Sequence, residues 1–387
     1  MSDSNRLRVS IVKESTYGVT PTSPSMQIMP VTGQSLRDAV GYTQSNIINA
    51  DRNVEELVRL SKTAGGQLPT ELMFSPTGEA LELLLCATMC ATETAVATVA
   101  SCTAAAGTKT ITRASGSFVS DGFEVGDIIS TSGGSTAANN GYWKVTNVVA
   151  LTLTVEADAN FTADTVTVTR GARRNNGVNE DSFTIEVARL DVEKAQIFTG
   201  CVVNTMDISV ADESIVNATF TFASANSTFQ TSDLGTDQYI SGATYTDATD
   251  HPVLDSLSVP EVRSAGAAFG AKTINLTINN NVMPRTELGT LGATSMRQGE
   301  FNTTGNIEAY FEDFTELQAY ADNTEGAIWF ALIDANSRGY TFSMPTVKFN
   351  DAGADVTGSN TDTMVSIGYQ ATLNDAQSCT VRMQRWA

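Results

Sequence analysis

Residues 66–72 read GQLPTEL, and residues 305–311 echo them as GNIEAYF. In each stretch a glycine opens a run in which apolar and polar residues roughly alternate, a pattern typical of a half-buried β-strand. Each run leads into a segment that we predict to be a short acidic helix. The first helix is predicted to follow an N-cap at Ser75 and to end near Met89, and the second covers residues 314–320. The second half of the chain therefore resembles the first.

The predicted strands after each helix extend this repeat. Identity between the halves is low, so the repeat rests on the order and pattern of the elements, and chance similarity between two β-rich halves is the alternative. The corresponding strand segments are 182–187 with 327–332, 196–206 with 340–349, and 215–222 with 364–371.

A segment of different composition interrupts only the first copy. Residues 93–174 are rich in Thr, Ser, Gly and Ala, and turn signals such as Gly133-Gly134 separate several short candidate strands. We interpret this segment as a small all-β barrel.

The chain is therefore predicted to be mainly β, with two repeated β-sandwich domains, each with a flanking helix, and the inserted barrel. The polar stretch before the second copy is predicted to be a connector. The predicted divisions are an extended N-terminal arm at 1–60, a discontinuous first domain at 61–92 and 175–225, the insertion at 93–174, the connector at 226–265, and the second domain at 266–387.

The charge balance argues against a nucleic-acid-binding protein. Asp and Glu total 43 against 23 Lys and Arg, which gives a formal net charge of −20. A protein that binds phosphate needs a basic surface to release counterions, and the densest basic cluster is the short run Arg170, Arg173 and Arg174. An acidic surface repels DNA, although solubility alone is an alternative explanation of the charge.

The sequence offers little material for catalysis or for binding a cofactor or metal. Five cysteines lack metal-ligand spacing, and Cys86 and Cys90 are predicted to be small buried residues on the first helix. His251 is the single histidine, which leaves nothing for a histidine-based triad or metal site. We therefore expect neither an enzyme nor a cofactor.

No signal for export or membrane insertion is visible. The first residues precede no apolar run, and no stretch approaches the roughly 18 apolar residues that a spanning helix needs. Synthesis in a bacterial cytoplasm fits these features.

Several stretches resemble tail tube proteins (major tail proteins) of bacteriophages with long, non-contractile tails. The resemblance covers nearly the whole chain, although its motifs are loose and structural. It rests on residues 12–21 (VKESTYGVTP), on the run from Asp51 through Gly65-Gly66 into the first helix, and on residues 123–127 (FEVGD) and 139–143 (NNGYW) of the insertion.

This resemblance implies a structural virion protein located in the tail. Six β-sandwich domains would form a ring, and stacked rings would make a tube through which DNA passes without being bound. A duplicated domain implies rings of three chains with pseudo-sixfold symmetry, with hexamers as the alternative. The implied partners are further copies of the chain, the tape measure protein, and the tail terminator and tip proteins, with no membrane involved.

Three acids are candidates to line the tube: Glu71, Glu308 and Glu312, which lie in or beside the repeated strands. An ordinary solvent-facing position is the alternative for each of them. The arm and the connector would reach neighbouring rings, and the barrel would project outward. A β-rich binding or adhesion module on a virion or cell surface remains the alternative function.

Overall fold

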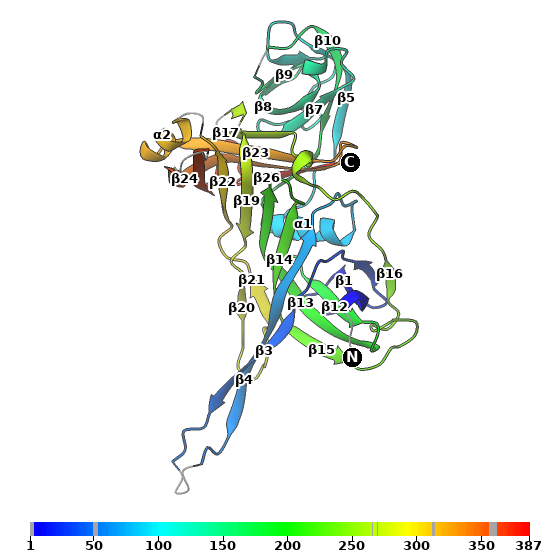
Figure 1. Cartoon of the computed structure of the whole chain (residues 1–387). Coiled ribbons are helices and arrows are strands. Elements are labelled where there is room, and N and C mark those ends of the chain that lie inside the picture. The colour runs from blue at the N-terminus through cyan, green and yellow to red at the C-terminus, as the bar shows by residue number, and fades with distance from the viewer. Residues whose placement is uncertain are drawn as a thin grey trace.

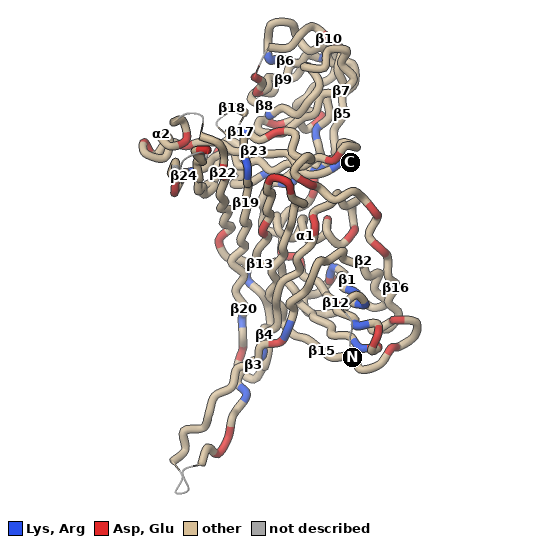
Figure 2. Tube along the Cα trace, in the orientation of Figure 1, with Lys and Arg blue, Asp and Glu red and all other residues tan. Residues whose placement is uncertain are grey.

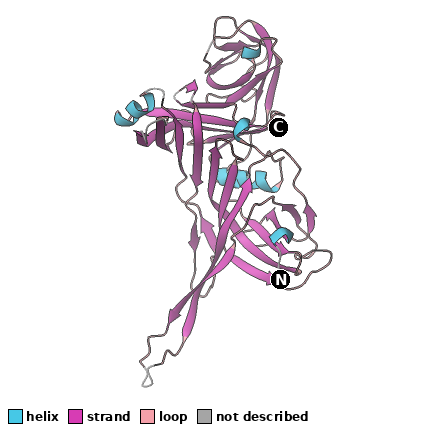
Figure 3. Cartoon of the chain, viewed as in Figure 1, coloured by secondary structure: helices cyan, strands magenta, loops and turns pink. Residues whose placement is uncertain are grey.

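The fold is described by a computed structural model that covers residues 4–48, 53–158, 160–264, 266–268, 270–311, 314–355 and 362–387. It is mainly β, as predicted, with two α-helices in these ranges (Figure 3). Glu312, one of the acids predicted to line the tube, lies outside the described residues.

One set of strands and a helix forms the part that we call the first unit (Figure 1). Its elements are β1 (Leu7–Lys13), β3 (Arg37–Gln44), β4 (Leu57–Glu71), α1 (Ala80–Met89), β12 (Phe183–Arg189), β13 (Lys194–Ala211), β14 (Asn217–Ser224) and β15 (Asn226–Gln230).

The second unit has the same order of elements. They are β17 (Glu261–Ser264), β19 (Ala271–Asn279), β22 (Asn302–Tyr310), α2 (Thr315–Ala321), β23 (Glu325–Ile333), β24 (Gly339–Asp355), β25 (Met364–Ala371) and β26 (Arg382–Trp386).

The strands of the two units pair in the same way. In each unit the first strand pairs with the strand after the helix. The long strand that follows pairs antiparallel with three strands: the one before it, the one after it and the last strand of the unit. The strand before the helix pairs with the strand that follows the long strand. The register matches as well: Gly66 lies opposite Phe222, and Gly305 lies opposite Tyr369. The long strand of each unit carries a bulge at an asparagine, Asn204 in β13 and Asn350 in β24.

The two units share one continuous sheet. The second half of β13 pairs with β19 in antiparallel fashion, from Thr205 opposite Asn279 to Ala211 opposite Thr273. The resulting strand order is β3, β4, β14, β13, β19, β22, β25, β24, and we call these eight strands the joined sheet. Its two ends are β3 and the second half of β24.

One face of the joined sheet covers the main hydrophobic core. Leu68, Phe220 and Leu276 from this face are fully buried together with Leu84 from α1. The first helix begins later than the sequence suggested, at Ala80 instead of just after Ser75. The N-cap position is held by Glu79, although the Ser75 hydroxyl accepts from the first-turn N–H of Glu82 at 3.3 Å.

The inserted segment folds as a closed six-stranded barrel, as predicted. It has its own core, in which Phe118, Phe123 and Leu153 are buried. Its first strand (Ala97–Ala104) consists of small residues that carry no clear strand pattern, and residues 172–174 of the predicted insertion lie outside the barrel, because β11 (Ala172–Asn175) pairs with β26. The barrel strands are β5 (Ala97–Ala104), β6 (Thr110–Thr112), β7 (Ile128–Ser132), β8 (Gly141–Val149), β9 (Thr152–Val155) and β10 (Asp164–Arg170).

The stretches expected to be an arm and a connector largely pack on the first unit. β1 pairs with β12 along its whole length, so residues 7–13 belong to the folded body. The hairpin of β3 and β4 instead projects away from the rest of the chain (Figure 1). No helix in the described ranges has the length and apolarity needed to cross a membrane. The remaining elements are β2 (Ser25–Ile28), β16 (Thr244–Thr246), β18 (Ala267–Ala268), β20 (Met283–Arg285), β21 (Ser295–Arg297) and the 3-10 turns Ser4–Arg6, Ala137–Asn139 and Ser256–Ser258.

Candidate functional surface

The face of the joined sheet that points away from the core is polar across both units, and we call it the polar face. Side chains alternate between the two faces along each strand. In β22, for example, Ile307 and Ala309 are buried, whereas Glu308 between them is exposed. The same alternation continues across the sheet and places mainly Thr, Asn, Ser and Gln on the polar face. These residues include Gln67, Asn217, Thr219, Thr221, Ser209, Asn275, Thr277, Asn306, Ser366 and Gln370.

Acids on the polar face are spread across both units. Glu71 lies at the end of β4, Asp207 in β13, Glu308 in β22 and Asp351 in β24, while the base Arg37 lies on β3. Figure 2 shows charged residues scattered singly along these strands. Such a surface carries weak negative charge and offers phosphate no cluster of bases.

Two of the three acids predicted from the sequence can be placed. Glu71 is half-buried opposite Asn217, and Glu308 is exposed between Thr273 and Ser366. The register makes Glu71 the counterpart of Tyr310 rather than of Glu308, although both acids share the polar face.

Sequence reasoning missed three charged residues of this face: Asp207, Asp351 and Arg37. Asp207 could have been found, because it alternates with the apolar Met206 and Ile208 in a segment already predicted as a strand. Its carboxylate accepts a hydrogen bond from the Thr277 hydroxyl of the second unit at 2.6 Å. This bond therefore ties the two units together on the polar face.

Neither a metal site nor an activated thiol is present among the described residues. No group of three or more His, Cys, Asp and Glu side chains in the described ranges could hold a metal ion. Burial raises the pKa of the Cys201 thiol to about 12 and that of Cys90 to about 11. Because the thiolate is the reactive form, these buried thiols are poor nucleophiles.

The barrel is fixed to the second unit by a buried network of charges, which we call the Asp127 node. The Asp127 carboxylate accepts from Arg173 of β11 and from Arg382 of β26, each at 3.0 Å. Burial raises the pKa of Asp127, while Arg382 and Arg173 act in the opposite direction. Such a buried carboxylate is stable only while its basic partners are present.

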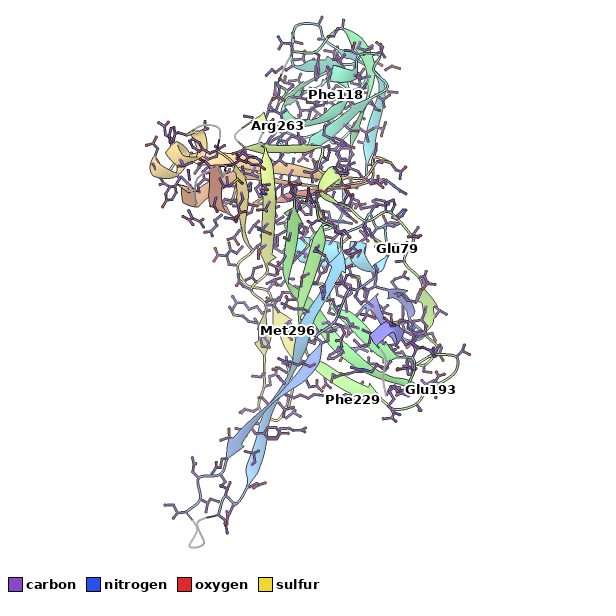
Figure 4. The ribbon with its side chains drawn as sticks, viewed as in Figure 1. Glu79, Phe118, Glu193, Phe229, Arg263 and Met296 are labelled. Atoms are coloured by element: carbon purple, nitrogen blue, oxygen red, sulfur yellow. The ribbon has the colours of Figure 1, made fainter. Side chains whose placement is uncertain are left out.

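Further contacts extend this attachment. The side chain of Gln384 bonds both backbone groups of Ile128, at 2.6 and 3.0 Å. Arg263 of β17 donates two hydrogen bonds of 2.8 Å to Asp158, where the barrel meets the second unit (Figure 4). The barrel is therefore inserted in the first unit but rests on the second.

Comparison with known proteins agrees with this architecture. The family described as phage tail tube protein matches residues 4–371, which is nearly the whole chain. No curated protein sequence gives a significant match. The chain therefore belongs to the phage tail tube protein family, whose members are structural components of the virion that assemble into the tail tube.

Proposed function

We propose that three copies of this chain form a ring with pseudo-sixfold symmetry, and that the rings stack into a tube that conducts DNA. The observation that carries this proposal is the junction of β13 with β19, which joins two equivalent units into one sheet. Two edge strands remain at the ends of that sheet, and exposed edges favour pairing with another chain. A junction that repeats head to tail closes a ring when the rotation permits it.

The size of the resulting barrel fits a conduit. Each chain supplies the eight strands of the joined sheet, so three chains supply 24. With strands about 4.8 Å apart and tilted by about 40°, such a barrel would be roughly 45–50 Å across. Side chains on its inner face would leave a channel wider than a DNA duplex.

We assign the polar face to the channel wall, because the opposite face covers the hydrophobic core. Glu71 and Glu308 would then face the lumen together with Asp207, and we extend the same role to Glu312. Carboxylates among neutral hydroxyl and amide groups would repel phosphate and let DNA slide without adhering.

The division of the chain follows from the same arrangement. The first and second units would be two tube domains of the β-sandwich type, and the barrel would lie on the outside of the ring. We expect the tube to form around the tape measure protein in the cytoplasm of a bacterial host, and to end on the terminator and tip proteins. The long non-contractile tail implied by the resemblance is part of this proposal.

Negative-stain electron microscopy of the purified, concentrated chain tests the proposal. We expect rings or hollow tubes with a central channel, and class averages with three outer lobes from the barrels. Six equal lobes would contradict the trimeric ring. A chain that stays monomeric at every concentration, also in the presence of preformed tail tips, would contradict the conduit itself.

A further inference from the structure

The two ends of the joined sheet have the form of two halves of a junction. Among the described residues, β3 pairs only with β4, and residues 351–355 of β24 pair only with β25. Inside the chain, the strands that correspond to these two edges, β13 and β19, are already paired with each other. The matching bulges make β24 the counterpart of β13, and the matching ladders make β3 the counterpart of β19.

The internal junction therefore serves as a template for a junction between chains. We propose that the second half of β24 pairs with β3 of the next chain in the register of the β13–β19 ladder. In that register Gly353 corresponds to Asp207, and Arg37 of the next chain corresponds to Thr277. Gly353 therefore lies opposite Arg37, as Asp207 lies opposite Thr277. Asp351 lies opposite Ala39, and Ala354 lies opposite Leu36.

The hydrogen-bonding pattern of the template defines which pairs bring side chains close together. The backbone N–H of Asn280 donates to Asn204 O at 2.8 Å, and that of Asp212 donates to Lys272 O at 3.0 Å. In an antiparallel ladder, hydrogen-bonded pairs alternate with closer, non-hydrogen-bonded pairs. The polar-face pair Thr205–Asn279 is of the closer kind, and so is its counterpart Asp351–Ala39 between chains.

The junction between chains would differ from its template in charge. On the polar face, residues diagonal to each other across two strands lie within reach of a long side chain. The proposed register places Asp351 diagonal to Arg37 of the next chain, and both side chains are exposed in the single chain. The internal junction has the uncharged residues Thr205 and Thr277 at the corresponding positions, and Thr277 donates to the Asp207 carboxylate directly opposite it. The ion pair would therefore mark the contact between chains.

The core side of the junction is consistent with this register. Where the internal junction buries Met206 and Ile208, β24 carries the small residues Ala352 and Ala354, which are only half-buried in the single chain. Their size leaves room for Asp38 of the next chain, which lies opposite Ala352 and is 3.6 Å from Lys62 Nζ. Pairing would cover these alanines in the same way as the internal junction covers Met206.

The second helix gives independent support. Eight residues of α1 are buried, and the second unit contributes to its cover, because Asn280 donates to Thr88 O at 3.3 Å and Tyr340 accepts from the N–H of Ser75 at 3.0 Å. No residue of α2 is buried, and the nearby Phe314 is 68% exposed. A neighbouring chain paired at β24 would lie beside α2 as the second unit lies beside α1.

Cysteine cross-linking tests this inference, which rests on the proposed ring. In the double variant Asp351→Cys with Ala39→Cys, we expect mild oxidation to link chains into dimers and trimers on a non-reducing gel. The pair Asp351→Cys with Asp38→Cys is the matched control, because a shift of one residue places the second side chain on the opposite face. Each single variant controls for the five native cysteines.

A charge exchange tests the ion pair separately. Arg37→Asp should raise the protein concentration needed for half-maximal assembly about fivefold to tenfold, as expected for replacing a surface ion pair by repulsion. Adding Asp351→Arg should restore assembly. If Arg37 served only to tune the charge of the lumen, the second change would give no rescue.

The outcomes separate the two proposals. Rings in which Asp351→Cys with Ala39→Cys stays uncross-linked, or in which the shifted pair cross-links equally, would overturn this register and leave the conduit standing. A wild-type chain that forms no rings, also in the presence of preformed tail tips, would overturn the conduit, and the junction with it.

Discussion

The first and second units share a pairing scheme but differ in what covers them outside the joined sheet. Glu186 in β12 and Trp329 in β23 occupy the same position in the register. Glu186 accepts from Arg8 and from Tyr245 of the connector, at 2.9 and 2.8 Å. Trp329 instead lies under the barrel and donates to Glu156 at 3.3 Å. The same strand scheme therefore holds a buried carboxylate at this position in one unit and a buried indole in the other.

This difference sets the symmetry that the chain can have. The strands could alternate around a ring as six equivalent units, but the barrel covers only the second unit of each chain. All three tryptophans, Trp143, Trp329 and Trp386, belong to the barrel or to its contact with the second unit. Tryptophan fluorescence therefore reports on the barrel and on its contact with the second unit, and not on the first unit. This difference allows the two units to be compared in solution.

The largest expected effect comes from breaking the Asp127 node. Asp127→Ala leaves the buried Arg173 and Arg382 with the half-exposed Glu124 as their remaining shared carboxylate, and we expect a loss of about 3–5 kcal/mol in the free energy of unfolding. Urea denaturation followed by tryptophan fluorescence measures it. Asp121→Ala is the matched control, because Asp121 forms an exposed ion pair with Arg113 and should cost less than about 1 kcal/mol. Equal losses of unfolding free energy in the two variants would show that the Asp127 node does not stabilise the contact between the barrel and the second unit.

The next effect compares the two helices. Leu84 of α1 is fully buried, so Leu84→Ala should lower the free energy of unfolding by about 2–5 kcal/mol. Leu317 of α2 is only partly buried, and Leu317→Ala should cost about 1 kcal/mol or less in the single chain. Urea denaturation followed by circular dichroism measures both.

Assembly sharpens this second comparison. If a neighbouring chain covers α2, Leu317→Ala should also weaken assembled tubes, measured as a lower dissociation temperature. A large loss from Leu317→Ala in the monomer would show that α2 is already covered within the chain.

The sequence was sufficient where local pattern decides the structure. The glycine-led runs at 66–72 and 305–311 gave the repeat, and the structure places them in the same register. Alternation of apolar and polar residues located β23 and β25 within two residues of their observed ends. Acids of the polar face such as Asp207 follow from the same alternation once the core side is known.

What the sequence could not supply depends on long-range contacts or on weak local signals. β5 reads ATVASCTA and consists of small residues, so neither size nor alternation marks it as a strand. α1 begins after Glu79 rather than after Ser75, and the backbone N–H of Ser75 donates to the hydroxyl of Tyr340, a residue of the second unit that lies far away in the sequence. The β13–β19 pairing joins segments far apart in the chain, and nothing in either segment alone specifies it.

The smallest expected effect comes from changing an aspartate whose carboxylate accepts hydrogen bonds from a turn. Asp164 does so in the barrel, which covers the second unit, and Asp233 does so in the connector, which covers the first unit. Hydrogen bonds from backbone N–H groups, first that of Thr136, lower the pKa of Asp164 in the barrel to about 2. In the connector, Asp233 has its pKa lowered in the same way, first by the N–H of Gly235. Because the folded pKa of Asp164 lies below its ordinary value of 3.8, its contribution to stability is present above that value and is lost as the pH falls toward 2.

We therefore expect Asp164→Asn to lower the melting temperature measured by tryptophan fluorescence at neutral pH, and the difference from wild type to shrink as the pH falls through this window. Trp143 is a suitable probe, since it donates to Thr131, whose hydroxyl binds Asn139 O beside Asp164. Asp233→Asn is the matched control and should leave this signal unchanged, because the connector covers the first unit. If Asp233→Asn shifted this melting temperature equally, the barrel and the connector would unfold together. The two units would then differ in composition but not in stability.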